Sequence, residues 1–155
     1  MNGREVKKDN DLFFLCSLIA YIARKTKNKP VSIVDFIGNQ RLQKIYDLAD
    51  IYHSDNIDRV CDDIIQECAI LNADFDNIST CEYHIPTHWD IGKVYKRLIL
   101  AVSAENNINI IDALIQVYHS FISDLIENYN SSFYYDNPNM IFEIYKKGEQ
   151  MLPTL

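Results

Sequence analysis

The stretch DLFFLCSLIAYIARKTKN, residues 11–28, decides the fold of this chain. Its apolar side chains recur at helical spacing, and further aliphatic and aromatic residues widen the stripe around most of the helix. A helix that is apolar almost all round belongs at the centre of a core. Asn10 or Asp11 is a good N-cap, and the cations of residues 24–27 suit the C-terminal end of the helix dipole. We therefore expect a buried helix from about residue 10 to residue 27, preceded by a polar N-terminal tail over residues 1–9.

Helical periodicity continues through most of the remaining chain. Further helices are expected over residues 32–38, 42–52, 56–69, 87–102 and 138–147. The longest periodic segment, residues 109–129, would form a rod about 30 Å long, whereas residues 70–86 form an irregular connection. The pattern predicts an all-α fold: a single compact bundle of six or seven helices around a long central helix at about residues 109–129.

The composition is that of one globular domain. The chain has 155 residues, of which 48% are hydrophobic and 24% charged, enough apolar material for a core of its own. Only four glycines and four prolines occur, whereas a β-sandwich or a barrel needs many turns marked by these residues. We therefore expect residues 1–155 to form a single helical domain.

The formal net charge of −7 argues against direct nucleic-acid binding, because that affinity comes mainly from Lys and Arg contacts to phosphates. An acidic surface suits a basic protein partner or the mimicry of a nucleic acid. The N-terminus shows no apolar signal segment, and no apolar run is long enough for a membrane span. No CxxC pair is formed by the cysteines, which are Cys16, Cys61, Cys68 and Cys81. We therefore expect reduced thiols, no disulfide and a cytoplasmic location.

The first helix together with IYDLADIYH, residues 45–53, resembles a small Firmicutes protein family of unknown function. That family is commonly encoded beside ADP-ribosyltransferase-like toxins. The resemblance covers about residues 11–68, and the matching positions are Phe14, Cys16, Tyr21, Tyr46, Leu48 and His53. This chain has Ala20 where the family tends to carry an acidic residue, so a role for that acid does not transfer. The resemblance implies a genetic setting beside a toxin and brings no known activity.

The strongest candidate for a metal site is Cys81-x2-His84-x3-His88, a spacing that lets thiolate and imidazole ligands converge on Zn²⁺. A structural zinc site needs four ligands. No second Cys/His pair stands at a matching distance, and only His53 could be recruited. We therefore expect no metal and no cofactor, with Cys81, His84 and His88 kept as the alternative.

Nucleophilic catalysis would need Cys16 or Cys61 beside His53 or His119, with the thiolate stabilised. Both cysteines lie on apolar helix faces, where burial lowers thiol reactivity. The sequence contains no G-x-S-x-G, glycine-rich phosphate loop or H-E-x-x-H motif. We therefore expect a protein that is not an enzyme. A small metal-dependent or Cys–His enzyme is the alternative from another functional class.

Two sets of side chains are candidates for a partner-binding surface. The first is an acidic stripe on one helix face, formed by Asp55, Asp58 and Asp62. A basic partner could dock there. The second is aromatic and consists of Trp89, Tyr134 and Tyr135, together with Phe133 and Tyr83. Tyrosine and tryptophan are enriched at interface hot spots. The simpler alternatives are that the acidic stripe is a solvated helix face and that the aromatic residues belong to the edge of the core.

These observations predict a non-enzymatic protein-binding module, an antitoxin-like or inhibitory partner from a mobile or defence-linked locus. Its partner would be another protein, such as a toxin or a defence effector, with no nucleic acid and no membrane bound directly. An acidic inhibitor of a nucleic-acid-handling defence protein is the alternative within the same class. The genetic setting follows from the resemblance, and the rest follows from the acidic composition and the missing catalytic motifs.

Overall fold

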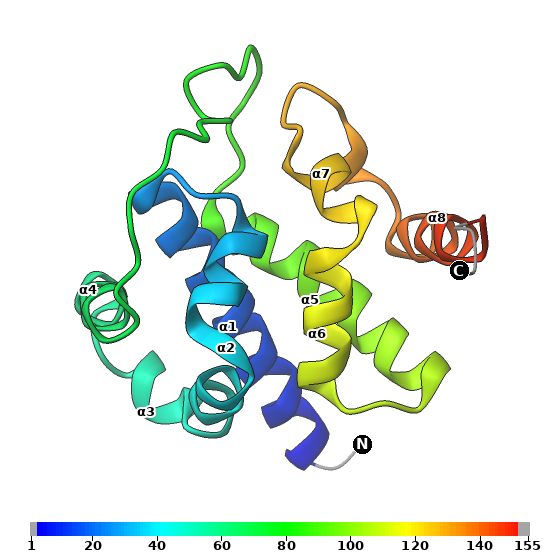
Figure 1. Ribbon diagram of the computed structural model, residues 1–155. Helices are drawn as coiled ribbons and strands as arrows, with labels where there is room; N and C mark the ends of the chain where they lie inside the picture. Colours follow the sequence, from blue (N-terminus) through cyan, green and yellow to red (C-terminus); the bar gives the residue numbers. More distant parts are fainter. Residues whose placement is uncertain (1–2, 152–155) are drawn as a thin grey trace.

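The fold consists of helices joined by turns and one long connection (Figure 1). The computed structural model describes the backbone of residues 3–151 and the side chains of residues 7–149. Its elements are α1 (Gly3–Thr26), α2 (Pro30–Asp47), α3 (Ala49–His53), α4 (Ile57–Glu67), α5 (His88–Asn106), α6 (Ile110–His119), α7 (Phe121–Glu127), the 3₁₀ turn η1 (Phe133–Tyr135) and α8 (Pro138–Met151). The structure is 73% helix and no strand occurs among the described residues, so the predicted all-α bundle is confirmed.

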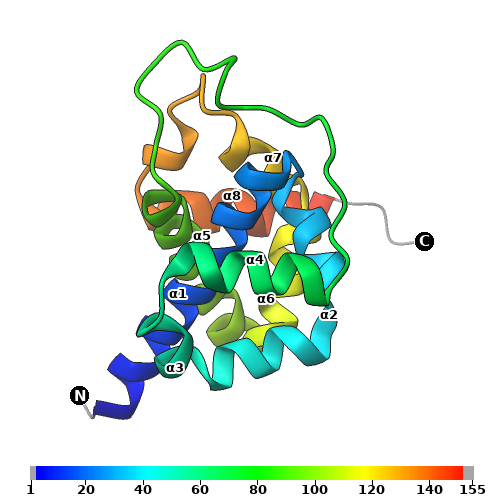
Figure 2. The ribbon, with the colours of Figure 1, turned by 90° about the vertical axis from the view of Figure 1, so that its left-hand side faces the viewer.

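Helix α1 lies at the centre of the bundle (Figures 1 and 2). It packs most extensively against α5 and also contacts α2, α3 and α4. Most of the apolar residues that form the wide stripe of α1 are buried. Those that are fully buried include Leu12, Leu15, Leu18, Ile19 and Ile22. This burial follows from the neighbouring helices, which cover α1 on several sides. The centre of the fold is therefore α1 and not the segment at residues 109–129.

Helix α1 begins about two turns before the expected N-cap at Asn10. The prediction of a polar tail over residues 1–9 is wrong for residues 3–9, which are helical; Met1 and Asn2 lie outside the described residues. Lys7 accounts for part of the extension, because its Nζ lies 3.1 Å from Asp11 Oδ2 one turn later and 2.8 Å from Asp50 Oδ2 in α3. Ion pairs between residues four positions apart favour helix, so polar residues continue α1 outward from the core.

The segment predicted as one long helix over residues 109–129 is two helices, α6 and α7. Between them Ser120 is extended, with φ −85° and ψ 166°. Its side chain accepts a hydrogen bond from the backbone N–H of Ile122 and so caps the start of α7. The break also changes which side faces the core: Ile122 and Ile126 are buried, whereas Phe121 is exposed.

Helices α1 and α5 approach each other most closely at Gly92. A Cβ atom at this position would lie 2.7 Å from the backbone nitrogen of Ser17 and 2.8 Å from its Cα. Both atoms belong to the backbone of α1, so rotation of a side chain could not relieve the contact. The absence of a side chain at Gly92 therefore allows the two central helices to pack at this distance.

Helices α5 and α6 are joined by a sharp turn. Asn107 ends α5 in the left-handed conformation, with φ 53°, and Asn109 caps the start of α6.

None of the helices in the described part of the chain is by itself long and apolar enough to cross a membrane. Helices α5 and α6 would qualify only as a pair, and they are bent by 116° relative to each other.

The connection between α4 and α5 runs over one end of the bundle (Figure 2). It contains no helix between Cys68 and Thr87. Two backbone hydrogen bonds attach it to the end of α1, since Ala73 N–H donates to Thr26 O and Phe75 N–H donates to Lys27 O, each at 2.9 Å. The loop that carries η1 lies at the same end (Figure 1). These two loops form the candidate site.

Candidate functional site

The acidic stripe lies at the start of α4, beside the C-terminal half of α1. Two of its members already have partners on α1: Asp58 accepts a hydrogen bond from the Tyr21 hydroxyl, and Asp62 lies 2.7 Å from the Lys25 ammonium. Asp55 accepts a hydrogen bond from the next backbone N–H. The stripe therefore takes part in the contact between α1 and α4, and its negative charge is partly neutralised there.

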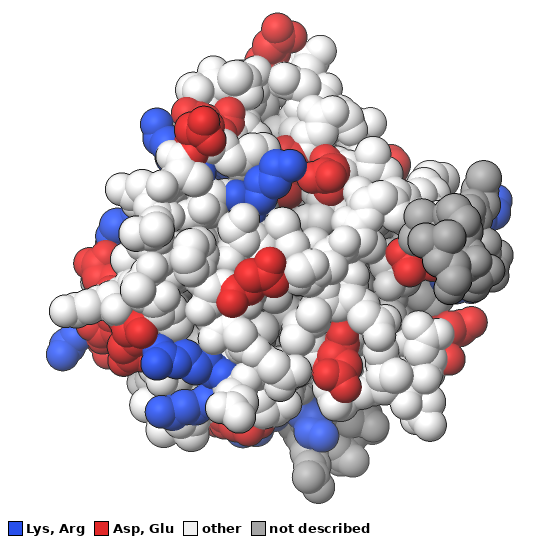
Figure 3. All heavy atoms as spheres, in the orientation of Figure 1, with Lys and Arg blue, Asp and Glu red and all other residues white. Residues whose placement is uncertain are grey.

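The charges on one face of the molecule are dispersed. On the face shown in Figure 3, acidic and basic side chains are interspersed among wide uncharged areas. The net charge of −7 is thus not gathered into one continuous field on that face. Docking driven mainly by electrostatic attraction would require such a field.

The residues of the alternative metal site are not brought together. Cys81 Sγ lies 3.3 Å from the carbonyl oxygen of Tyr83 and 3.8 Å from that of Tyr129. His84 is exposed, and His88 packs against other aromatic rings. Within the part of the chain that the structure describes, no group of three or more His, Cys, Asp and Glu side chains could hold a metal ion. The geometry therefore gives no support to the zinc alternative.

Cys16 and Cys61 are buried, as the apolar helix faces predict. Burial raises the pKa of the Cys16 thiol to about 12 and that of the Cys61 thiol to about 11. At neutral pH such thiols are protonated and are poor nucleophiles. Both therefore behave as small apolar residues of the core.

Trp89 does not line the groove or the hollow that is lined by Tyr134 and Tyr135, members of the same predicted aromatic set. Its half-buried indole packs against three rings, with centroids 5.6 Å from Phe13, 6.4 Å from His53 and 4.6 Å from His88. This cluster joins α1, α3 and the start of α5. Trp89 is therefore a packing residue at the edge of the core.

Tyr134 and Tyr135 line a groove where the two end loops meet. We call it the tyrosine groove; its volume is about 380 Å³, and its lining includes Tyr83, His84, Tyr129, Asn130, Tyr134 and Tyr135. Tyr83 on one loop is 67% exposed and Tyr135 on the other is 73% exposed. The centroids of the Tyr134 and Tyr135 rings are 4.9 Å apart, and Tyr129 meets Tyr134 edge to face at 5.8 Å. The groove thus brings together the tyrosines of the predicted aromatic set.

Hydrogen bonds fix the two loops that form the tyrosine groove. The Asn130 side chain joins them, because its Oδ1 accepts from Glu82 N–H at 2.7 Å and its Nδ2 donates to Thr80 O at 3.0 Å. Phe133 is buried and anchors η1 to the core. The exposed rings therefore stand on an ordered backbone, which reduces the entropy lost on binding.

A second hollow, of about 280 Å³, adjoins the tyrosine groove. His84, Tyr134 and Tyr135 line both. Charged side chains of both signs surround this hollow, namely Asp90, Lys93, Arg97 and Asp136. An aromatic centre with a polar, charged rim is the usual arrangement of a protein–protein interface.

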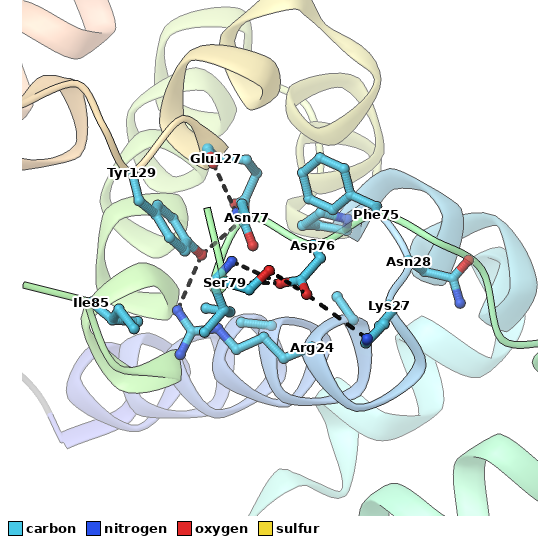
Figure 4. Close-up of a pocket in the computed structure, with 14 residues that line it drawn as sticks. Arg24, Lys27, Asn28, Phe75, Asp76, Asn77, Ser79, Ile85, Glu127 and Tyr129 are labelled. Carbon is cyan, nitrogen blue, oxygen red and sulfur yellow. Dashed lines mark hydrogen bonds and ion pairs between the residues drawn. The ribbon is translucent and has the colours of Figure 1, made fainter. Parts of the chain in front are cut away.

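A cavity with both polar and apolar walls lies between the C-terminal part of α1, the end of α7 and the connection at residues 75–79 (Figure 4). We call it the Arg24 cavity; its volume is about 390 Å³. Tyr129 lines both this cavity and the tyrosine groove. The Tyr129 hydroxyl accepts a hydrogen bond from Arg24 Nη2 at 3.1 Å and donates one to Glu127 Oε1 at 3.0 Å.

Glu127 lies at the inner side of the Arg24 cavity and is only 6% exposed. Its carboxyl group accepts hydrogen bonds from Tyr95 at 2.8 Å, from Tyr129 at 3.0 Å and from Asn77 Nδ2 at 3.3 Å. Burial raises the pKa of this carboxyl, and the bonds from Tyr95 and Tyr129 partly oppose the rise. A buried carboxyl is tolerated only where such partners replace water.

Sequence reasoning missed the polar network of Arg24, Asn77 and Glu127. A cation at position 24 is also expected from the helix dipole, because Arg24 lies in the last turn of α1. Glu127 does not fall on the apolar stripe of its helix, so its spacing suggests an exposed residue. The available signal was weak: Ser123 and Glu127 lie four positions apart on one helix face, but the neighbouring Asp124 and Asn128 have the same spacing. Only the folded chain shows that they share the Tyr95 hydroxyl, at 2.9 and 2.8 Å.

Comparisons with known protein families, with curated proteins and with solved structures found no match to this chain.

Proposed function

We propose that the chain is a non-enzymatic protein-binding module, an antitoxin-like or inhibitory partner that acts in the cytoplasm. The observation that carries this proposal is the exposure of Tyr83 and Tyr135 on opposite loops of the tyrosine groove. Leaving two large rings in water on an ordered backbone is unfavourable, and covering them with a partner gains free energy. The resemblance over residues 11–68 is the reason for choosing a toxin or defence effector as that partner.

The chemistry of the tyrosine groove suits a protruding segment of a folded protein. Tyrosine rings offer broad apolar contact at a small entropy cost, and their hydroxyl groups form hydrogen bonds. Ser131 and Ser132 add hydroxyl groups along the groove. The charged residues around the adjoining hollow provide a rim that excludes water from the aromatic contacts.

The acidic stripe is a weaker candidate for the interface. Tyr21 and Lys25 already use part of the acceptor capacity of Asp58 and Asp62, so these carboxylates would gain less from binding another protein. An acidic inhibitor of a nucleic-acid-handling protein would depend on this stripe, so the two hypotheses place the interface on different parts of the surface.

The test is calorimetric titration of the purified chain with the protein encoded by the adjacent gene. We expect Tyr83→Ala and Tyr135→Ala each to weaken binding by about tenfold or more, because interface tyrosines are frequent hot spots. The matched control is Leu71→Ala, which removes an apolar side chain that is 71% exposed outside the groove. This variant should bind like the wild type.

Charge reversal at Asp55, Asp58 and Asp62 completes the experiment. Under our proposal the triple Asp→Lys variant retains its affinity for the partner; circular dichroism must first show that it folds, because Asp58 and Asp62 also contact α1. Loss of binding in this variant, with unchanged binding of both tyrosine variants, would show that the acidic stripe is the interface.

A further inference from the structure

The Arg24 cavity is separate from the exposed rings of the tyrosine groove and is lined by groups suited to a small ligand. Its polar lining includes Arg24, Lys27, Asp76, Asn77 and Tyr129. Its apolar lining includes Ala20, Ala23, Phe75 and Ile78. The volume of about 390 Å³ falls within the range of small-molecule sites.

The carboxylates in this cavity already have hydrogen-bond partners. Glu127 accepts bonds from Tyr95, Tyr129 and Asn77. Asp76 accepts from the backbone N–H groups of Ile78 and Ser79, each at 3.0 Å, and from the Ser79 hydroxyl at 2.8 Å. Both acids thus stabilise the protein itself and leave little acceptor capacity for a cationic ligand.

Arg24 has donor capacity that the protein does not use. Its Nη2 donates to two neutral oxygen atoms, the Pro86 carbonyl at 2.6 Å and the Tyr129 hydroxyl at 3.1 Å. Its Nε is buried and has no hydrogen-bond partner among the residues described. A buried N–H of a charged group without an acceptor is unfavourable. Among the described residues no carboxylate pairs directly with the guanidinium, and Glu127 is linked to it only through the Tyr129 hydroxyl. A ligand could supply an anionic group bonded directly to Arg24.

Lys27 places a second cation at the mouth of the cavity. Its side chain is 60% exposed, and its Nζ lies 3.8 Å from Asp76 Oδ2. Figure 4 shows Lys27 and Arg24 on the same side of the cavity, both projecting from the end of α1. An anion that entered past Lys27 would meet Arg24 next to the apolar wall.

We propose that the Arg24 cavity binds a small organic anion whose carboxylate or phosphate group pairs with Arg24. The planar guanidinium matches the geometry of both groups and can bind either through two parallel hydrogen bonds. A compact apolar body on the ligand lies against Ala20, Ala23 and Phe75. Anion binding here requires no protein partner at the tyrosine groove, although Tyr129 lines both sites.

Nuclear magnetic resonance titration of the full chain tests the proposal with three probes of similar shape: benzoate, phenyl phosphate and neutral benzamide. We expect saturable shifts of the backbone amides of Lys27, Asn77 and Ser79 with at least one anion in the millimolar range, and affinity about tenfold lower for benzamide. The comparison of benzoate with phenyl phosphate identifies the preferred anionic group. Equal affinity for benzamide, or no saturable shift with either anion, would overturn the proposal.

Variants at the cavity provide the second part of the test. Arg24→Gln should abolish binding of the anion, and Lys27→Asn should weaken it severalfold. Asn suits position 27 because its φ of 54° lies in the left-handed region, so this variant tests the charge even if Arg24→Gln does not fold. Lys44→Gln, which removes an exposed cation outside the cavity lining, is the matched control and should bind normally. If Arg24→Gln folds, undiminished anion binding in both variants would contradict the proposal. If Arg24→Gln does not fold, undiminished anion binding in Lys27→Asn would contradict it.

Discussion

Glu127 is the residue at which burial and charge conflict most directly. Its carboxyl is surrounded by the hydroxyl groups of Tyr95 and Tyr129 and by the Asn77 amide, yet burial still raises its pKa. In the unfolded chain the same group is solvated and ionises at its ordinary pKa. The folded state therefore holds the proton more tightly than the unfolded state does, and protein stability depends on pH.

The substitution Glu127→Gln should remove this pH dependence. The wild-type contribution is fully present below the ordinary pKa of 4.5 and is lost as pH rises through the raised pKa of the folded state. We therefore expect the free energy of unfolding of the wild type to fall relative to that of Glu127→Gln as pH increases above 4.5. Urea denaturation of both proteins at several pH values measures the difference. A difference that does not change with pH would contradict this account; exposed Glu82→Gln should follow the wild type.

Trp89 and Tyr135 should respond differently to truncation, although both belong to the predicted aromatic set. Trp89→Ala removes an indole that packs on Phe13, His53 and His88, so we expect it to lower the free energy of unfolding by about 1–3 kcal/mol. Tyr135→Ala removes a ring that is mostly in water and should change it by no more than about 0.5 kcal/mol. Thermal and chemical denaturation provide the comparison. Equal destabilisation by both substitutions would show that the tyrosine, too, is a packing residue.

At the scale of elements, helical periodicity predicts most of the fold, since the helices and the buried side of α1 follow from the spacing of apolar residues. It does not predict the break at Ser120, because apolar residues continue at helical spacing through that position. A serine can lie within a helix or cap the next one, and only the packing of α7 selects the second. The chain likewise turns after Pro86, which separates Trp89 from Tyr83. Such contacts between distant segments are not encoded in local spacing.

The packing of α1 against α5 should depend on Gly92. We expect Gly92→Ala to destabilise the protein by about 1–3 kcal/mol or more, because the new methyl group would meet the backbone of Ser17. Gly148→Ala is the matched control, since there the three atoms nearest to the new methyl group all belong to the ring of Phe121, which is partly exposed and can rotate away. Alanine has a higher helix propensity than glycine, and this gain offsets the cost of moving the Phe121 ring. Denaturation of the two variants measures the contrast, and a Gly92→Ala variant as stable as Gly148→Ala would argue against the close approach.

At the scale of the whole molecule, helices form the rigid body and two loops at one end carry the candidate sites (Figure 1). The tyrosine groove faces solvent with exposed rings, whereas the Arg24 cavity lies behind Tyr129 among buried polar groups. The sequence indicated Tyr134 and Tyr135 as binding residues, but the groove depends on Asn130, which joins loops about 50 residues apart in the chain. Such a long-range contact is visible only in the folded protein.

Hydrogen–deuterium exchange of the free chain and of its complex with the protein encoded by the adjacent gene tests the central claim most directly. We predict slower amide exchange on binding in residues 80–85 and 130–136, the two loops of the tyrosine groove, because the partner shields them. Exchange in α4 should remain unchanged. Protection confined to residues 55–62, with both groove loops exchanging as fast as in the free chain, would contradict the account and place the partner on the acidic stripe.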